Sequence, residues 1–194
     1  MNPVEHGFPE DPWELLRDWL PSNDDPVRPT MTLATLDHGI PDARTLLLSE
    51  FDAHGFYFHT DSRSRKIEQL AADPSVALML HLPEQRRQLT VQGIAEVAPD
   101  EESARVYRAR SPYLQQLAWQ NTVEFAGLDD ADREASWASF AAAHADGFGR
   151  PPTWIGYLVR PSRLTFWFGS ESTASRRVEY QTSPGGWAVS FRAG

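Results

Sequence analysis

The chain has 194 residues, and its 27 acidic against 18 basic side chains give a net charge of −9 near neutral pH. This length suits one domain with small additions, and the negative field argues against non-specific binding to nucleic acid or to an anionic membrane. The sequence contains no cysteine, which excludes disulfides, thiolate nucleophiles and cysteine-ligated metals. No apolar run approaches the roughly 20 residues of a membrane helix, and the acidic first segment does not resemble a secretory signal. We therefore expect a cytoplasmic protein without a membrane or nucleic-acid partner.

The first 28 residues are predicted to form an arm with a short helix. Residues 1–10 are mostly polar, and Asp11 followed by Pro12 is typical of an N-cap and a first helical position. Trp13, Leu15, Leu16 and Leu20 then give an amphipathic pattern. Turn formers follow over residues 21–30, and we predict a single domain over residues 29–194.

Short strands dominate the rest of the chain. We predict strands over residues 31–36, 44–49, 54–60, 75–82, 88–98, 154–159, 163–168, 177–180 and 187–191. Helices are predicted over residues 65–72, 100–110, 112–119 and 130–144, with Asp100 as an N-cap. Because no helix follows most of these strands, the pattern favours an antiparallel barrel over a doubly wound parallel sheet.

The densest polar segment is His59-Thr60-Asp61-Ser62-Arg63-Ser64-Arg65-Lys66, between a predicted strand and a predicted helix. Its hydroxyls, its three cations and the N–H groups of the helix start are the components of an anion site. The alternative is a solvated helix start that happens to be basic. The sequence has no glycine-rich nucleotide loop and no G-x-S-x-G motif, and its scattered histidines do not favour a metal site.

Three other positions could contact a ligand, and each also has a plain structural interpretation. Arg44 lies on a largely apolar strand, so it needs either a partner or an exposed sheet edge. Gln88 could pair with a donor and an acceptor on a ring edge, although surface glutamines are common. Trp167 could cover a flat ring or pack in the core.

Together these segments resemble the pyridoxine/pyridoxamine 5′-phosphate oxidase family, from about Pro29 to the C-terminus. The similar segments are Arg44-Thr45-Leu46-Leu47-Leu48, Phe58-His59-Thr60 with Ser64-Arg65-Lys66, Arg87-Gln88, Ala118-Trp119, Trp154-Ile155-Gly156-Tyr157 with Phe166-Trp167, and Arg177, Tyr180 and Trp187. Any one of these is weak, but six in register are specific. The resemblance implies an α+β, mainly β fold: an antiparallel split β-barrel of the FMN-binding type, with peripheral helices and C-terminal dimerisation strands.

The resemblance also implies FMN bound at a homodimer interface. Arg44 and Lys66 would hold its phosphate, Gln88 would address the isoalloxazine edge, and Trp167 and Arg177 would come from the partner chain. The implied cofactor-binding residues are Arg44, Thr45, Leu46, Leu47, His59, Thr60, Ser64, Arg65, Lys66, Gln88, Trp167 and Arg177.

The substrate half departs from the family pattern. The family's substrate-binding Lys is Ser49 here, and its helical Tyr, Arg and Ser fall on Val106, Arg110 and Leu114, with Tyr107 adjacent. Its RLHDR segment reads Thr173-Ala174-Ser175-Arg176-Arg177. On the cofactor side, a Gln-Ser pair that helps to bind the FMN phosphate in the family is replaced near Val123-Glu124. Each lost charge-assisted contact is worth about 1.5–3 kcal/mol. The remaining substrate candidates are Ser49, Tyr107, Arg110, Thr173 and Ser175, and no residue is singled out as a catalytic acid or base.

Three functions follow as hypotheses. The first is an FMN-dependent oxidoreductase that transfers hydride to flavin N5 from another small molecule, with Arg110 as an anchor for an anionic group. The second is a genuine pyridoxamine 5′-phosphate oxidase of pyridoxal phosphate biosynthesis. The third is an FMN-binding protein without turnover. Relatives whose barrel holds a deazaflavin or haem are a further alternative.

Overall fold

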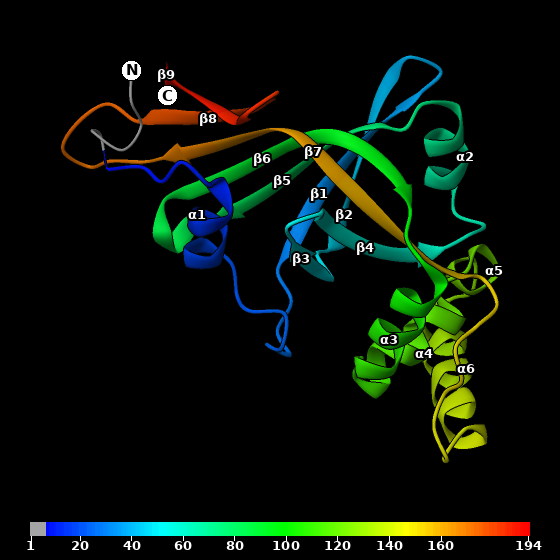
Figure 1. Cartoon of the computed structure of the whole chain (residues 1–194). Coiled ribbons are helices and arrows are strands. Elements are labelled where there is room, and N and C mark those ends of the chain that lie inside the picture. Colours follow the sequence, from blue (N-terminus) through cyan, green and yellow to red (C-terminus); the bar gives the residue numbers. More distant parts are fainter. Residues whose placement is uncertain (1–6) are drawn as a thin grey trace. The chain divides into compact units, whose positions relative to one another are not determined.

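The structure is a computed structural model, and it describes residues 7–194. The part of the expected arm at residues 1–6 therefore lies outside the described residues. The elements, in chain order, are α1 (Pro12–Trp19), β1 (Thr30–Asp37), β2 (Ile40–Leu47), β3 (Glu50–Asp52), β4 (Gly55–Asp61), α2 (Arg65–Ala72), β5 (Ser75–Leu82), the short 3₁₀ helix η2 (Pro83–Gln85), β6 (Arg87–Val97), α3 (Asp100–Ala109), α4 (Pro112–Gln120), α5 (Val123–Ala126), α6 (Asp130–Ala143), β7 (Trp154–Phe168), β8 (Arg176–Ser183) and β9 (Gly186–Ala193) (Figure 1).

The chain forms two compact units. The first comprises residues 7–58, 65–97 and 157–194, and contains most of the strands. The second comprises residues 59–64 and 98–156, and contains helices α3 to α6. The single domain over residues 29–194 stays a prediction.

Nine strands of the described chain form one sheet. Its hydrogen-bonded order is β2-β1-β5-β6-β7-β4-β3, and β8 and β9 extend it from β7. The registered pairs are antiparallel, as predicted from the lack of a helix after most of the strands.

The core lies on one face of this sheet. Cross-strand register aligns Leu33, Leu78, Val91 and Leu164 in one row, and all four side chains are fully buried. Trp19 of α1 meets Phe166 edge-on, with ring centroids 5.0 Å apart. The period-2 alternation of apolar residues therefore gives this sheet one apolar face that needs cover.

Local signals placed the first helix correctly. The Asp11 side chain accepts a hydrogen bond from the Trp13 N–H at 3.1 Å, which confirms its predicted role as N-cap. The predicted cap at Asp100 is wrong: Asp100 is the first residue of α3, and Pro99 precedes it without a side-chain cap. The carboxylate of Asp100 instead pairs with Arg150, whose Nη1 lies 2.7 Å away.

Strand β7 is continuous, whereas the sequence predicted two strands over the same stretch. The register between β6 and β7 shifts at Gln92 and Gly93, and this irregularity lets the ladder pass Pro161 without ending. Gly93 permits the close approach, because a Cβ there would lie 2.1 Å from the Arg160 carbonyl oxygen. The short elements β3 and α5 were not predicted, since three or four residues carry too little periodicity.

The second unit is held partly by buried amides. Gln116 of α4 donates to the Trp137 carbonyl oxygen at 2.8 Å and to Gln120 Oε1 at 2.6 Å. The bond to Trp137 ties α4 to α6, and the bond to Gln120 lies within α4. None of the helices between residues 7 and 194 combines the length and the apolar character that a membrane crossing requires.

Candidate functional site

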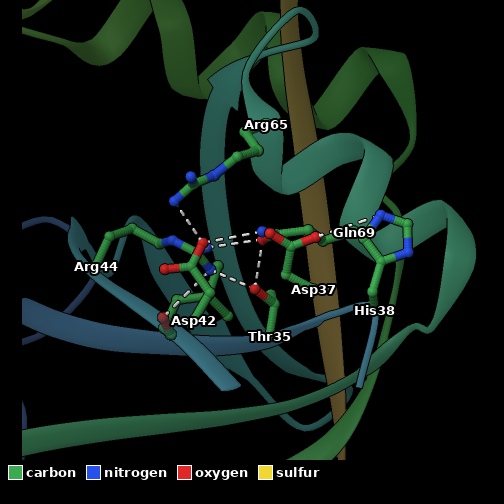
Figure 2. A network of polar contacts seen from close by, with 8 residues as sticks. Thr35, Asp37, His38, Asp42, Arg44, Arg65 and Gln69 are labelled. Carbon is green, nitrogen blue, oxygen red and sulfur yellow. Dashed lines mark hydrogen bonds and ion pairs between the residues drawn. The ribbon is translucent and has the colours of Figure 1, made fainter. Parts of the chain in front are cut away.

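A polar network joins β1, β2 and α2 in the first unit (Figure 2). Arg44 lies opposite Leu33 and so projects from the core face of the sheet. Its Nη1 donates to Thr35 Oγ1 at 2.6 Å, and its Nη2 donates to Asp42 Oδ2 and Gln69 Oε1, both at 2.7 Å. The partner that the sequence required for Arg44 is therefore Asp42, two residues earlier on the same strand.

Asp42 is the acceptor on which the network converges. Its Oδ2 also accepts from Arg65 Nη2 at 2.7 Å and from Gln69 Nε2 at 2.9 Å. The Gln69 hydrogen bond, aided by the positive charges of Arg44 and Arg65, lowers the pKa of Asp42 against the opposing effect of burial. The carboxylate is thus ionised at neutral pH, and two guanidinium groups hold one oxyanion.

Burial divides this network into an inner and an outer part. Thr35 and Gln69 are buried, and the side chains of Arg44 and Asp42 are 20% and 21% exposed. The Arg65 side chain is 70% exposed. A cavity of about 350 Å³ adjoins the outer part, and Arg65 and Gln69 contribute to its lining together with the β1–β2 turn. Arg65 therefore faces an open cavity, and the carboxylates of Asp37, Glu68 and Asp73 line that cavity as well.

A second group of expected residues forms a row on the other face of the sheet. Gln88 lies directly opposite Trp167, and Trp167 lies directly opposite Arg177. Gln88 is three residues from Val91, so it projects from the face opposite to the core row and to Arg44. Gln88 and Trp167 are half-buried, and Arg177 is exposed.

The remaining residues of the first motif are divided between the two faces. Alternation along β2 places Leu46 on the face of Arg44, and Thr45 and Leu47 on the face of Gln88. Ser49 is buried just beyond β2, and its N–H donates to the Tyr57 carbonyl oxygen at 2.8 Å. Lys66 is half-buried at the second position of α2, directly after Arg65.

Within the second unit, the basic loop after β4 is less cationic than its sequence suggests. Arg63 forms a two-point contact with Asp61, with Nη2–Oδ2 at 2.7 Å and Nε–Oδ1 at 3.0 Å. Thr60 Oγ1 and Ser64 Oγ lie 3.3 Å apart. Of the three cations in the segment, Arg63 is therefore neutralised locally, while Arg65 joins the network at Asp42.

The buried ring of His59 belongs to the same unit. Its Nε2 lies 3.2 Å from Glu102 Oε2, and its ring stacks on Trp154 with centroids 5.2 Å apart. Sequence reasoning missed Glu102, because an acidic residue in the first turn of a helix is usually explained by the helix dipole. His59 was expected among the cofactor-binding residues, and its side chain here contacts Glu102 and Trp154.

Arg110 is the positively charged member of the expected substrate residues. The group lies 4.3 Å from the Trp154 ring centre, and burial lowers its pKa to about 10. Within residues 7–194 it has no ion pair or hydrogen bond, and none of its nitrogen atoms is an unsatisfied buried donor. Its donors therefore reach the surface beside an aromatic ring.

The other expected substrate residues contribute less. The Tyr107 hydroxyl is buried and donates to the Gly149 carbonyl oxygen at 2.8 Å, so the hydroxyl is committed to the backbone. Thr173 is exposed and Ser175 half-buried in the loop between β7 and β8 of the first unit. Thr173 N–H donates to Ser170 Oγ at 3.1 Å, and the Ser175 carbonyl oxygen accepts from Gly194 N–H at 3.2 Å.

The chain is similar in sequence to known proteins over most of its length. Residues 26–144 match the sequence profile of a family described as pyridoxamine 5′-phosphate oxidase. A pyridoxine/pyridoxamine 5′-phosphate oxidase of Ralstonia pickettii is 40% identical over 161 residues, which cover 82% of this chain and 76% of that protein. One from Caulobacter vibrioides is 33% identical over 185 residues, which cover 93% of this chain and 83% of that protein.

Solved structures show the same fold. PhzG from Burkholderia lata 383, in complex with tetrahydrophenazine-1-carboxylic acid, aligns over 100% of this chain and 98% of its own, with a TM-score of 0.81 and 24% identity. A pyridoxamine 5′-phosphate oxidase-related, FMN-binding protein from Nostoc punctiforme aligns over 85% of this chain and 88% of its own, with a TM-score of 0.70 and 17% identity. The predicted antiparallel split-barrel fold with peripheral helices is confirmed.

Proposed function

The chain belongs to the pyridoxamine 5′-phosphate oxidase family, and we propose that it is an FMN-dependent oxidoreductase whose substrate is not pyridoxine or pyridoxamine 5′-phosphate. Family membership supports an oxidoreductase or flavin-binding protein. The choice of FMN, the substrate and the roles of single residues are our proposal.

The convergence of Arg44 and Arg65 carries the cofactor part of the proposal. Both guanidinium groups donate to the same Asp42 oxygen, which supports their use as paired donors to an oxyanion. A phosphate group offers the same kind of acceptor with more charge. Arg44 and Arg65 would therefore hold the phosphate of FMN, with Lys66 and Ser64 beside them in the chain.

The row of Gln88, Trp167 and Arg177 supports a role at the flavin ring. An amide can pair with both a donor and an acceptor of the ring edge, and an indole offers a flat apolar surface. Because this row and Arg44 project from opposite faces of the sheet, residues of two protomers would combine at one cofactor. This supports the expectation that Trp167 and Arg177 act from a partner chain.

The outer face of the sheet fits such a dimer. It carries half-buried, uncharged residues on β1, β5, β6 and β7, namely Thr32, Ala34, Ala77, Met79, Thr90 and Thr165. Glu179 of β8, opposite Thr165, is the charged residue beside them and pairs with Arg163 and Arg192. Small uncharged side chains on a sheet face are suited to close packing against a second surface. We propose that this face is the homodimer interface.

The residues of the chain would orient the cofactor and substrate rather than supply the redox chemistry. FMN, when bound, supplies the hydride acceptor at flavin N5. Arg110 would bind an anionic group of the substrate with its open donors, while the Trp154 ring fixes the guanidinium plane. Ser49 is buried and carries no charge, so it cannot replace the family's substrate-binding Lys, which is why we propose a different substrate.

The visible absorption spectrum of the purified protein tests the cofactor part. After FMN is added and the excess removed, we expect a retained and perturbed flavin spectrum. A protein that remains colourless would overturn the proposal. Bleaching of the bound flavin under anaerobic conditions by an anionic small molecule would identify a substrate. If none of a broad panel of amines, alcohols and nicotinamides bleaches it, the protein binds FMN without turnover.

A second candidate function is pyridoxamine 5′-phosphate oxidation itself. The names of curated relatives at 33–40% identity favour it. Steady-state oxidation of pyridoxamine 5′-phosphate separates the two candidates. Efficient turnover would establish the second, and absent or very slow turnover would support the first.

A further inference from the structure

We infer that Asp42 is an internal competitor for the cofactor phosphate, and that it sets how tightly Arg44 and Arg65 hold that phosphate. This inference rests on the proposed function. It concerns a residue outside the expected cofactor set, and its basis is the contact pattern in Figure 2. Asp42 would weaken phosphate binding by occupying the same donors.

The donors of Arg44 are largely taken by protein acceptors. Nη1 bonds Thr35 Oγ1, and Nη2 bonds both Asp42 and Gln69, all within 2.7 Å. Asp42 is the charged member of these acceptors. A phosphate that binds Arg44 with charge-assisted bonds must therefore share or replace the Asp42 contact.

At the exposed edge of the network, Asp42 also competes with phosphate for the donors of Arg65. Its Nη2 contacts Asp42 Oδ2 at 2.7 Å, although the rest of its side chain is mostly exposed. An exposed arginine gains little from a single surface ion pair and can turn toward a more highly charged anion. The Arg65–Asp42 contact is thus the part of the network that can exchange.

The buried members would keep Arg44 in place during that exchange. Thr35 and Gln69 are buried, and the Thr35 hydroxyl donates to Gln69 Oε1 at 2.7 Å. These two neutral acceptors hold the guanidinium without adding charge. A phosphate that replaces the Asp42 contact must also accept from the buried Gln69 Nε2, which donates to Asp42 Oδ2 at 2.9 Å.

The charges give the direction of the effect. Arg44, Arg65 and Asp42 together carry two positive charges and one negative charge. A phosphate dianion beside this group is attracted by the pair and repelled by the carboxylate. Removing the carboxylate charge should leave both arginines available, so phosphate should bind more tightly.

The experiment compares Asp42→Asn with the wild-type protein and with Asp24→Asn as a matched control. Asp24 is exposed in the loop before β1 and does not line the cavity beside the network. Flavin fluorescence titrations measure the dissociation constants of FMN and of riboflavin, which lacks the phosphate. Thermal unfolding with and without inorganic phosphate gives a second readout that does not depend on the flavin.

We expect Asp42→Asn to bind FMN about tenfold more tightly, with riboflavin binding unchanged. Its melting temperature should be lower than that of the wild-type protein in phosphate-free buffer. Inorganic phosphate should raise the melting temperature of Asp42→Asn by more than it raises that of the wild type. Asp24→Asn should match the wild type in all three measurements. Weaker or unchanged FMN binding by Asp42→Asn would overturn the inference, because Asp42 would then be a positioning or purely structural residue.

Two further outcomes are also decisive. If Asp42→Asn folds only when phosphate or FMN is present, the anion replaces the carboxylate and the inference is supported. If it fails to fold with either anion present, Asp42 is a structural residue and the inference is wrong. Wild-type protein that does not bind FMN would refute the proposed function alone, because the response of Asp42→Asn to inorganic phosphate still tests the competition.

Discussion

The Arg110 guanidinium lies 4.3 Å from the centre of the Trp154 ring, and no carboxylate of the described chain pairs with it. A half-buried cation without a counter-ion is unusual in a chain of net charge −9. Burial also lowers its pKa, to about 10, so it remains charged at neutral pH. The arrangement is suited to an anionic group that approaches along an aromatic surface.

Arg110→Gln should weaken binding of an anionic substrate. The loss of charge-assisted hydrogen bonds should reduce kcat/KM by about tenfold to a hundredfold, with no change in FMN affinity. Arg108→Gln is the matched control, since Arg108 lies on the same helix and is exposed. Equal effects of the two substitutions would show that Arg110 acts through the electrostatic potential of the second unit and not through direct contact with the substrate.

The proposed dimer face can be tested by a single charge. Ala77 is half-buried on β5, between Ala34 and Gln92 of the neighbouring strands. Ala77→Lys should weaken the dimer by at least about a hundredfold, because the ammonium would be buried without a partner. Light scattering over a dilution series measures this, and FMN retention should fall with it.

Ala71→Lys provides the comparison for that prediction. Ala71 is exposed on helix α2, and its substitution adds the same charge. It should leave the oligomeric state unchanged. A wild-type protein that is monomeric at high concentration would contradict the proposed interface.

Gly55 should contribute strongly to the stability of the sheet. Its φ is +151°, and a Cβ there would lie 2.1 Å from the Val159 carbonyl oxygen on the paired strand β7. Gly55→Ala should lower the free energy of unfolding by about 3 kcal/mol through strain and steric overlap. Gly185→Ala, which meets no atom within 4 Å, should change it by no more than about 1 kcal/mol. Chemical denaturation measures both.

Asp61 should contribute to stability in a defined acid window. Burial alone would raise its pKa, but hydrogen bonds from Arg63 and Thr153 outweigh that effect and lower the pKa. Because the folded pKa lies below the unfolded value of about 3.9, the contribution is complete above that pH and disappears as the pH falls through the folded pKa.

Asp61→Asn should therefore lose less stability than the wild type between about pH 5 and pH 2. Urea unfolding at several pH values measures the free energy of unfolding and its dependence on pH. Asp146→Asn, which alters an exposed carboxylate, should follow the wild-type curve. If Asp61→Asn also follows that curve, the Arg63 and Thr153 contacts do not act on the Asp61 proton.

Much of the fold could be predicted because it depends on short-range patterns. The alternation of Leu33, Leu78, Val91 and Leu164 with polar neighbours is visible in each strand separately, and the Asp11 cap lies two residues from its partner. The order of the family motifs along the chain was equally accessible, and it led to the split barrel that the comparisons confirm. The site assignments carried by those motifs stay predictions.

Contacts between distant residues could not be derived in this way. Nothing near Asp42 in the chain indicates that Gln69, 27 residues later, donates to it, or that His59 meets Glu102, 43 residues later. The partners of the loop cations could not be predicted either. Arg63 and Arg65 lie two residues apart in one basic segment, yet Arg63 pairs with Asp61 and Arg65 pairs with Asp42.

The physical reason is that propensity, capping and apolar alternation act within a few residues, whereas the charge at a site depends on which elements meet. The sequence established a mainly β protein with cations suited to an oxyanion. The packing of α2 against the β1–β2 hairpin then determined which cations are available and placed an acidic side chain among them. Hydrogen bonds and ion pairs need contact distances of about 3 Å, and only the folded chain sets those distances.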